Sequence, residues 1–190
     1  MDCDPARPAD SNATDAEKAA AWDPALRVRG FLTARGWPAP AVADSGNGYH
    51  LLYRIDLPND PAADRLVCGV LRALARRFNS PAVKIDTTVS NAARITKLYG
   101  TPTRKGVDAP ERPRRPSRLL ETPEVMSPVP ADLLDGLAAQ APPEAVAVQT
   151  RSPSFWRSDV TSKPACALRL LHSKPLMRSG SGKRPDTGPF

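Results

Sequence analysis

Two aspartates at the start of the chain, Asp2 and Asp4, are separated by a single residue. Alternate residues of an extended strand point to the same side, so a strand here would project both carboxylates from one face. Neighbouring carboxylates repel each other unless a cation lies between them, and Mg²⁺ is the usual cation where phosphates are also bound. The pair therefore indicates a metal site for a phosphate substrate, with a solvated chain end as the alternative.

A turn of small residues, Ser45-Gly46-Asn47-Gly48, is followed by Tyr49 and His50. Small residues allow backbone amides to approach an anion, and a histidine that follows can donate to a phosphate. Ser45, Gly48 and His50 are therefore candidates for phosphate binding. An Asn-Gly hairpin with an incidental histidine accounts for the same residues without any ligand.

A third group of candidates begins with Asp86, at the end of a predicted strand, and continues with Arg94 and Lys105. An acidic residue followed by spaced cations suits a triphosphate held beside metal ions. The alternative is a charge run that is merely solvated.

The basic residues are concentrated in residues 94–118, where eight Lys and Arg stand against two acids. The whole chain has 27 basic and 20 acidic residues and a net charge of +7, so this stretch holds almost all of the excess. Such a balance favours a polyanionic partner such as nucleic acid. The candidates for DNA binding are Lys97, Arg104, Arg112, Arg114 and Arg115.

These residues must be positioned by regular elements, and local signals predict most of them. Thr14 and Glu17 match a capping box, which predicts a helix to about residue 35, interrupted at Asp23-Pro24 by a new cap and a first-turn proline. The Asn-Gly turn predicts a hairpin whose second strand is residues 49–55. Asp60-Pro61 opens a helix that reaches residue 78 with an apolar stripe. Further predicted elements are strands at residues 83–86, 95–99 and 119–120 and a helix at residues 130–139.

The bulk composition limits the class of protein. The cysteines, Cys3, Cys68 and Cys166, are odd in number and far apart, which suits neither a disulfide framework nor a zinc site. No apolar run approaches the ~20 residues of a membrane span, and the first residues are unlike a signal peptide. We therefore expect a cytoplasmic protein without membrane contact. Periodicity ends near residue 141, which predicts one domain at residues 1–140 and a disordered tail, rich in Pro, Ser and basic residues, at residues 141–190.

Taken in order, the motifs resemble the archaeo-eukaryotic primase superfamily, in its plasmid and phage primase-polymerase branch. No single motif is decisive, and the order of five of them carries the resemblance, over roughly residues 2 to 140. The matching segments are Asp-x-Asp-Pro-x-Arg-Pro at residues 2–8, Thr-x-x-Glu at 14–17, Gly-Trp-Pro at 36–38 with Ser-Gly-x-Gly-x-His at 45–50, the lone Asp86, and Asn-x-x-Arg-Ile at 91–95 with Gly-Thr at 100–101 and Lys-Gly at 105–106.

The resemblance implies an α+β fold, a small mixed or antiparallel sheet like that of an RNA-recognition motif, flanked by helices. It implies a DNA primase/polymerase, a template-dependent nucleotidyl transferase of DNA replication. In the family three carboxylates hold two divalent ions, Mg²⁺ or Mn²⁺, and the matching positions are Asp2, Asp4 and Asp86. His50 matches the histidine that contacts the phosphates of the incoming nucleotide, and Arg94 and Lys105 are candidates for further contacts. The implied partners are a single-stranded DNA template, nucleoside triphosphates and a replicative helicase encoded elsewhere.

One departure from the family concerns the start of the chain. The first aspartates of the family end a buried strand, whereas here Met1 stands where that strand should be. We therefore expect an N-terminally truncated domain that lacks its first strand, with Asp2 and Asp4 on a frayed end. Two other functions stay open: an inactive primase remnant that binds single-stranded DNA, and a basic interaction protein whose motifs are coincidental.

Overall fold

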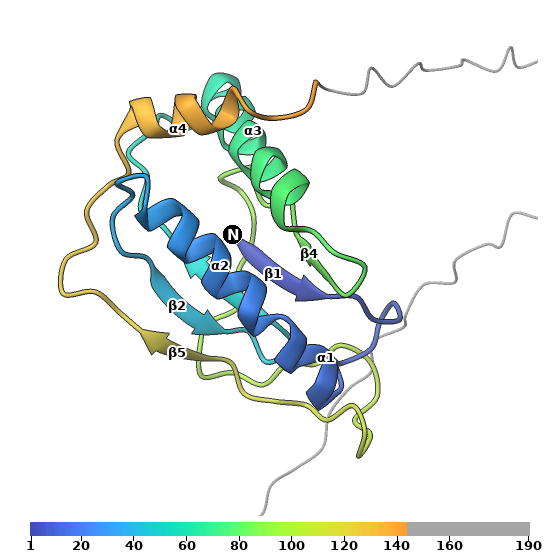
Figure 1. Cartoon of the computed structure of the whole chain (residues 1–190). Helices are drawn as coiled ribbons and strands as arrows, with labels where there is room; N and C mark the ends of the chain where they lie inside the picture. The colour runs from blue at the N-terminus through green and yellow to red at the C-terminus, as the bar shows by residue number, and fades with distance from the viewer. Residues whose placement is uncertain (144–190) are drawn as a thin grey trace, which may run out of the picture. The chain divides into compact units, whose positions relative to one another are not determined.

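The computed structural model describes residues 1–143, so the expected tail at residues 141–190 lies outside the described residues except for its first three. The described chain forms a five-stranded antiparallel sheet with helices, and the α+β prediction is confirmed (Figure 1). None of its helices is long and apolar enough to cross a membrane. In chain order the elements are β1 (Asp2–Pro5), α1 (Asp15–Ala20), α2 (Trp22–Thr33), β2 (Ala41–Asp44), β3 (Tyr49–Leu52), α3 (Pro61–Phe78), β4 (Val83–Ile85), β5 (Arg118–Glu121) and α4 (Ala131–Ala138).

The strand that carries the first two aspartates lies inside the sheet. The strand order is β4-β1-β3-β2-β5, so β1 has a neighbour on both sides. Asp2 stands opposite His50 on β3, and Asp4 stands opposite Lys84 on β4. The expectation of a frayed end at Asp2 and Asp4 is therefore wrong. Two strands that are distant in the sequence supply the backbone partners that hold this short segment extended.

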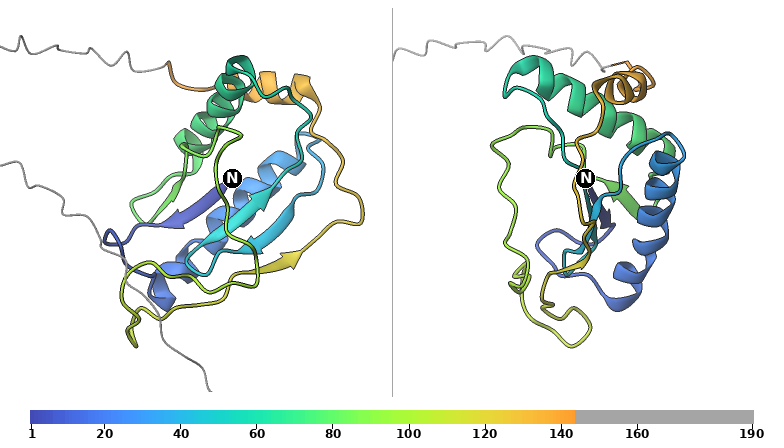
Figure 2. Two further views of the ribbon diagram at one scale, coloured as in Figure 1. Left: turned by 180° about the vertical axis from the view of Figure 1, so that it is seen from behind. Right: turned by 90° about the vertical axis from the view of Figure 1, so that its left-hand side faces the viewer.

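The two faces of the sheet differ in what covers them (Figures 1 and 2). Helices α1 and α2 lie over one face, while residues 86–117 cross the other as a long connection with little regular structure. Cys3, Leu51 and Ile85 are buried in the core on the helical side. Because side chains alternate along a strand, their neighbours Asp2, His50 and Asp86 point to the other side. We call that side the open face.

The helices begin where their sequence signals place them. Thr14 caps α1 through a hydrogen bond from the Glu17 amide, and the Glu17 carboxylate accepts from the Thr14 amide, which confirms the capping box. Two helices replace the single one, as predicted, but the break lies at Ala21 and Pro24 falls within the first turn of α2. Asp60 caps α3, whose buried residues include Val70, Leu71 and Leu74 of the predicted stripe.

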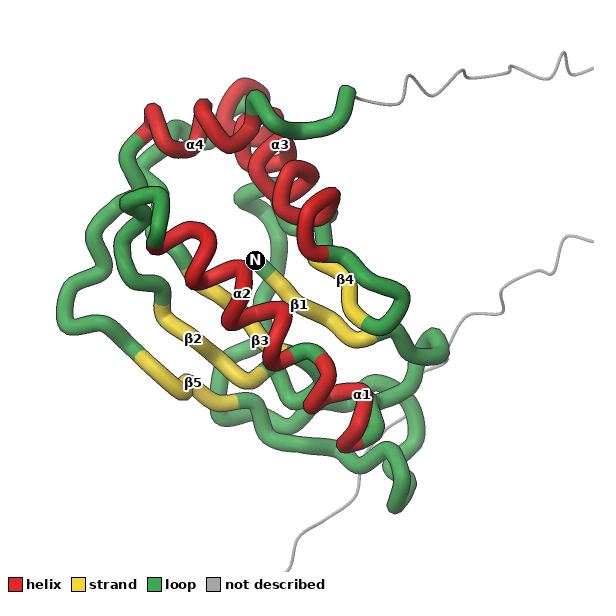
Figure 3. Tube along the Cα trace, viewed as in Figure 1, coloured by secondary structure: helices red, strands yellow, loops and turns green. Residues whose placement is uncertain are grey.

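The connection over the open face does not contain the strand predicted at residues 95–99. Ile95 and Leu98 are 93% and 79% exposed, and none of the strands in residues 1–143 pairs with them. Figure 3 shows this stretch as loop. It is held instead by isolated backbone bonds, such as Gly100 N to Ser117 O at 2.6 Å and Thr103 N to Arg115 O at 2.8 Å. The remaining predicted elements are confirmed, with β3 ending at Leu52 rather than at residue 55.

Candidate functional site

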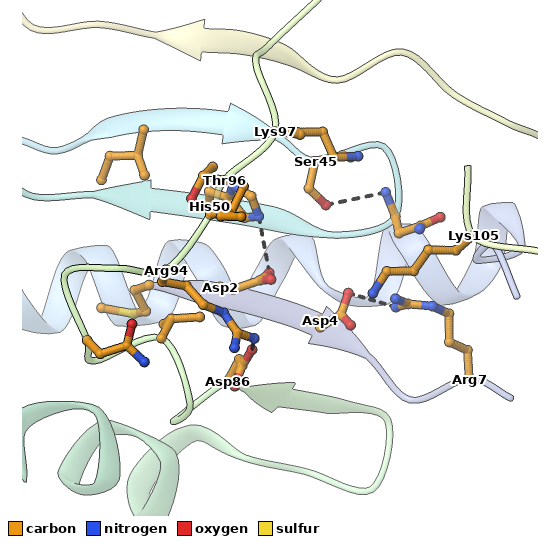
Figure 4. A pocket seen from close by; sticks show the side chains of 16 residues that line it. Asp2, Asp4, Arg7, Ser45, His50, Asp86, Arg94, Thr96, Lys97 and Lys105 are labelled. Carbon is orange, nitrogen blue, oxygen red and sulfur yellow. Dashed lines mark hydrogen bonds and ion pairs between the residues drawn. The ribbon is translucent and has the colours of Figure 1, made fainter. Parts of the chain in front are cut away.

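A pocket of about 440 Å³ lies on the open face between the sheet and the connection. Its walls come from β1, the β2–β3 turn, β3 and the connection that follows β4 (Figure 4). The structure thereby brings together side chains as far apart in the sequence as Asp2 and Lys105. The predicted site residues in its lining are Asp2, Asp4, Ser45, His50, Asp86, Arg94, Lys97 and Lys105.

Three of these residues form a row across adjacent strands. Asp2 is the register partner of His50, and the amide of Asp86 donates to the Asp2 carbonyl at 3.0 Å. The row therefore runs from Asp86 beside β4, through Asp2 on β1, to His50 on β3. Backbone pairing fixes all three Cα positions, so the row is part of the rigid sheet rather than of a loop.

The Asp2 side chain is 29% exposed, but its Oδ1 atom is buried. His50 Nε2 lies 3.5 Å from Asp2 Oδ1, which is too long for a good hydrogen bond, and Oδ1 has no hydrogen-bond partner within the described residues. Burial raises the pKa of Asp2, but His50, the N-terminal amine and Lys105 oppose it, and the net pKa lies below the ordinary 3.8. Asp2 is thus an ionised acceptor whose buried Oδ1 has no hydrogen-bond partner among the described residues.

Asp4 is paired with a residue that we did not predict as part of the site. Arg7 Nη1 lies 2.7 Å from Asp4 Oδ1, and its Nε donates to the Ser11 carbonyl at 3.0 Å. The Arg7 side chain is only 8% exposed, and it lines the pocket. The signal that could have found it is the Pro-x-Arg-Pro motif at residues 5–8.

Asp86 is held in a short network. Its Oδ1 accepts from the Thr88 amide at 2.8 Å and from the Thr88 hydroxyl at 2.7 Å. Arg94 Nη2 donates to the same hydroxyl at 3.1 Å and lies 3.7 Å from Asp86 Oδ2. Each of the three predicted carboxylates therefore has a basic side chain beside it.

The β2–β3 turn uses its donors internally. The amides of Asn47 and Gly48 point at Ser45 Oγ at 3.4 and 2.8 Å, and the Gly46 amide donates to Asp44 Oδ1 at 2.7 Å. These amides were predicted to meet an anion, but each already has an acceptor in the chain. Gly48 has a different structural role, because a Cβ there would collide with the carbonyl oxygen of Cys3. Its lack of a side chain lets β3 approach β1.

Two lysines reach the pocket from the connection. Lys97 Nζ donates to the Ser45 carbonyl at 2.9 Å, and burial together with the nearby Lys105 lowers the pKa of Lys97. Lys105 is followed by Gly106, whose φ of +74° and tight packing on the Asp10 carbonyl leave no room for a side chain. This contact anchors the backbone beside Lys105.

The residues predicted to bind DNA divide into two groups. The guanidinium groups of Arg112, Arg114 and Arg115 are bonded within the chain: Arg112 to Glu17 at 2.8 and 2.9 Å, Arg115 to the Ala13 carbonyl at 2.7 Å and to Asp15 at 2.6 Å, and Arg114 to the Gly106 carbonyl at 3.2 Å. Arg104 is exposed and lines a second pocket of about 510 Å³, together with Lys105 and Lys84. Lys84 was not among the predicted residues.

Tyr99 is a further residue that the sequence did not point to. Its hydroxyl lies 2.7 Å from Nδ1 of His50, on the side of the ring away from Asp2. We predicted it only as the last residue of a strand. No local pattern reveals its role, because the contact joins two residues 49 positions apart.

The carboxylate oxygens of the pocket are suitable ligands for a hard divalent cation. Carboxylates are the ligands that Mg²⁺ and Mn²⁺ prefer, and Asp2 Oδ1 is a buried acceptor with no partner in the described part of the chain. Within residues 1–143, however, no three carboxylate, imidazole or thiol groups are clustered closely enough to share one ion as they stand. The two-ion site at Asp2, Asp4 and Asp86 therefore stays a prediction.

Comparisons with protein-family models, with curated proteins and with solved structures found no match to this chain. The resemblance to the primase superfamily therefore stays a prediction from the order of the motifs.

Proposed function

We propose that this chain is a DNA primase/polymerase of the archaeo-eukaryotic primase superfamily, a nucleotidyl transferase that extends or makes primers on single-stranded DNA. The observation that carries the proposal is the row of Asp86, Asp2 and His50 on three adjacent strands, open to one pocket. These residues were selected from three separate motifs. If His50 were an incidental hairpin residue and Asp2 a solvated chain end, nothing would require the two side chains to lie side by side.

The charges of the pocket favour a ligand that carries both signs. Three carboxylates repel a bare polyanion, and the basic side chains beside them repel a bare cation. A nucleoside triphosphate with divalent ions offers a cation to each carboxylate and phosphate oxygens to each basic group. The basic members of the lining are Arg7, Arg94, Lys97 and Lys105.

The mechanism divides the work between these two sets. Asp2, Asp4 and Asp86 would hold the divalent ions, which neutralise the triphosphate and activate the attacking 3′-hydroxyl when bound. Arg7 and Arg94 now lie against Asp4 and Asp86, so each is placed to bind phosphate once its carboxylate has another partner. His50 lies beside Asp2 and can donate to the same phosphates. Because the sheet fixes the row, positioning and electrostatics supply the rate enhancement.

We propose that the template strand lies beside the pocket. The second pocket shares Asp4, Arg7 and Lys105 with the first and adds the exposed Lys84 and Arg104. A strand of DNA lying there would reach the reacting groups while its phosphates meet these cations. The helicase partner and the cytoplasmic location remain predictions.

Primer extension tests the proposal. The purified chain is incubated with bare or primed single-stranded DNA, ribo- or deoxyribonucleotides, and Mg²⁺ or Mn²⁺. We expect products from the wild type and a loss of at least about 100-fold in Asp86→Asn, because the charge that holds the ion is removed. Asparagine retains an oxygen for the Thr88 amide and hydroxyl, so the fold should survive.

The matched control is Asp56→Asn, which removes the same charge from the exposed connection between β3 and α3. It should extend primers as the wild type does. If the wild type gives no product with either ion but binds single-stranded DNA in a salt-sensitive way, the chain is a non-catalytic binding protein. If it does neither, the superfamily function is wrong for this chain.

A further inference from the structure

The contact between Tyr99 and His50 is the least expected feature of the site. The two side chains come from the connection and from β3, and their rings lie 67° apart in an edge-on arrangement with centroids 5.9 Å apart. The Tyr99 hydroxyl is 2.7 Å from Nδ1, which is a short and well-formed hydrogen bond. The other ring nitrogen, Nε2, faces Asp2 and the pocket.

We propose that Tyr99 is a positioning residue for His50: its hydroxyl donates to Nδ1 and thereby holds the neutral imidazole as the Nε2–H tautomer, with that N–H aimed into the pocket. The role in nucleotide binding rests on the proposed function. The hydrogen bond and the tautomer do not.

The direction of the hydrogen bond follows from the group on the far side of the ring. A neutral imidazole has one N–H donor and one bare acceptor nitrogen. An ionised carboxylate only accepts, so a bare Nε2 facing Asp2 Oδ1 at 3.5 Å would set two lone pairs against each other. Nε2 therefore carries the hydrogen, Nδ1 is the acceptor, and the Tyr99 hydroxyl must donate.

The surroundings of Tyr99 keep its proton in place. Burial, and after it the charge of Asp2, raise the pKa of Tyr99 to about 12. The phenol is therefore a donor at any pH at which the protein would work. The His50 side chain is 12% exposed, so little solvent competes for the ring.

The arrangement leaves the Nε2–H available for a ligand. Its distance of 3.5 Å from Asp2 Oδ1 is longer than a good hydrogen bond, so a phosphate oxygen in the pocket can compete for it. Without the Tyr99 hydroxyl the ring is free to turn over or to exchange tautomers. The ligand would then meet a lone pair for part of the time.

Nuclear magnetic resonance tests the hydrogen bond itself. The chain has two histidines, and His172→Gln leaves only His50. Long-range ¹H–¹⁵N spectra at about pH 8.5, above the ordinary range of an imidazole, identify which nitrogen carries the hydrogen. We expect the Nε2–H form, with the ¹⁵N resonance of Nδ1 displaced as for a hydrogen-bonded acceptor. In Tyr99→Phe this displacement should disappear.

The matched control is Tyr53→Phe. The Tyr53 hydroxyl is buried with no hydrogen-bond partner among residues 1–143, and its ring packs on Trp37, so its removal should leave the His50 spectrum unchanged. An Nδ1–H tautomer in the wild type, or the same Nδ1 resonance with and without the Tyr99 hydroxyl, would overturn the proposal.

Nucleotide binding separates this inference from the proposed function. With Mg²⁺ and a nucleoside triphosphate, Tyr99→Phe should weaken affinity by about tenfold, and it should have no further effect in a His50→Ala background. Equal effects in both backgrounds would show that Tyr99 acts without His50. If the wild type binds no nucleotide while the spectra show the Nε2–H tautomer and the Tyr99 effect, the proposed function fails and the positioning role stands.

Discussion

Each acidic side chain of the pocket lies against a basic one, and this alternation decides what the pocket can bind. Asp4 and Arg7 give the shortest of these pairs, at 2.7 Å. A divalent ion that approaches Asp4 must compete with the guanidinium, whereas a nucleotide that arrives with its ions gives the guanidinium a phosphate in exchange. Arg7 should therefore oppose the binding of free ions and favour the binding of nucleotide with ions.

A substitution of Arg7 should therefore change the affinity for free ions and the affinity for nucleotide in opposite directions. Arg7→Met keeps much of the side-chain length and removes the charge, so we expect Mn²⁺ alone to bind several-fold more tightly and the nucleotide with Mn²⁺ to bind several-fold more weakly. Electron paramagnetic resonance of free Mn²⁺ and a nucleotide titration measure the two affinities. Arg27→Met, on the exposed surface of α2, should change neither. A change of the same sign in both affinities would contradict the idea that Arg7 leaves Asp4 for a phosphate when an ion binds Asp4.

The site could be predicted at the positions where residue type alone suggests chemistry. Aspartates two apart, a histidine after a glycine-rich turn and an acid before a run of cations are visible in the sequence, and they line one pocket. Tyr99 and the internally bonded Arg112 were not visible in these roles. Both depend on contacts 49 and 95 residues apart, and no local rule supplies such a distance.

At the scale of elements, β1 depends on close approach by the turn that precedes β3. A Cβ at Gly48 would collide with the Cys3 carbonyl and would lie 3.3 Å from the Asp4 Cα. Gly48→Ala should therefore push β3 away from β1 and cost about 1–3 kcal/mol in the free energy of unfolding, measured in urea. Primer extension should also fall, even under conditions where the variant is fully folded, because the Asp2–His50 pair spans the same two strands.

The matched control for this substitution is Gly30→Ala on the exposed side of α2. A Cβ there meets nothing within 4 Å, so alanine should stabilise the helix by up to about 1 kcal/mol. If both alanine variants had the same stability, the close contact at Gly48 would not matter to the fold.

A second element-scale contact ties the connection to α1. Glu17 belongs to the capping box and also forms a bidentate ion pair with Arg112. The Arg112 hydrogen bonds lower the pKa of Glu17 below its ordinary 4.5, partly opposed by burial. A carboxyl with a lowered pKa in the folded state stabilises the fold above its ordinary pKa, and that contribution is lost as the pH falls through the lowered value.

The charge can be removed without removing the cap. Glutamine can accept from the Thr14 amide, so Glu17→Gln should lose only the ion pair and should be slightly less stable than the wild type near neutral pH. At a pH below the lowered pKa of Glu17 the wild type has lost the same charge, so the two unfolding curves should converge in acid. Glu124→Gln, at an exposed position, should match the wild type throughout. A deficit that persisted in acid would show that the contact is not ionic.

Local sequence signals correctly predicted the elements that are determined by residues close together in the sequence. The α1 and α3 starts and the hairpin turn are set by residues within three or four positions, and the structure has them where predicted. The break between α1 and α2 was misplaced by two residues. We predicted a frayed end where β1 forms a paired strand, and a strand at residues 95–99, which form a loop. A strand requires a partner, and the partners of β1 lie about 50 and 80 residues away.

At the scale of the whole described domain, the sheet separates a helical face from a charged one. Helices α2 and α3 share the core with the apolar sides of the strands, which leaves the opposite sides for the pocket and its cations (Figure 2). The basic side chains that remain exposed beside the pocket include Lys84 and Arg104, whereas Arg112 and Arg115 hold the connection in place. Binding of a polyanion should therefore depend on a few cations rather than on the whole basic stretch.

The salt dependence of the affinity for single-stranded DNA measures how many of these cations contact phosphate. Each phosphate contact contributes about 0.7 to the slope of log affinity against log salt concentration for a single strand. The double variant Lys84→Ala, Arg104→Ala should reduce the slope by about 1.4 if both residues contact phosphate. Arg27→Ala removes one charge from the helical face and should leave the slope unchanged. A slope that follows net charge alone, wherever the charge lies, would mean that DNA is attracted by the chain as a whole and that the open face is not its binding surface.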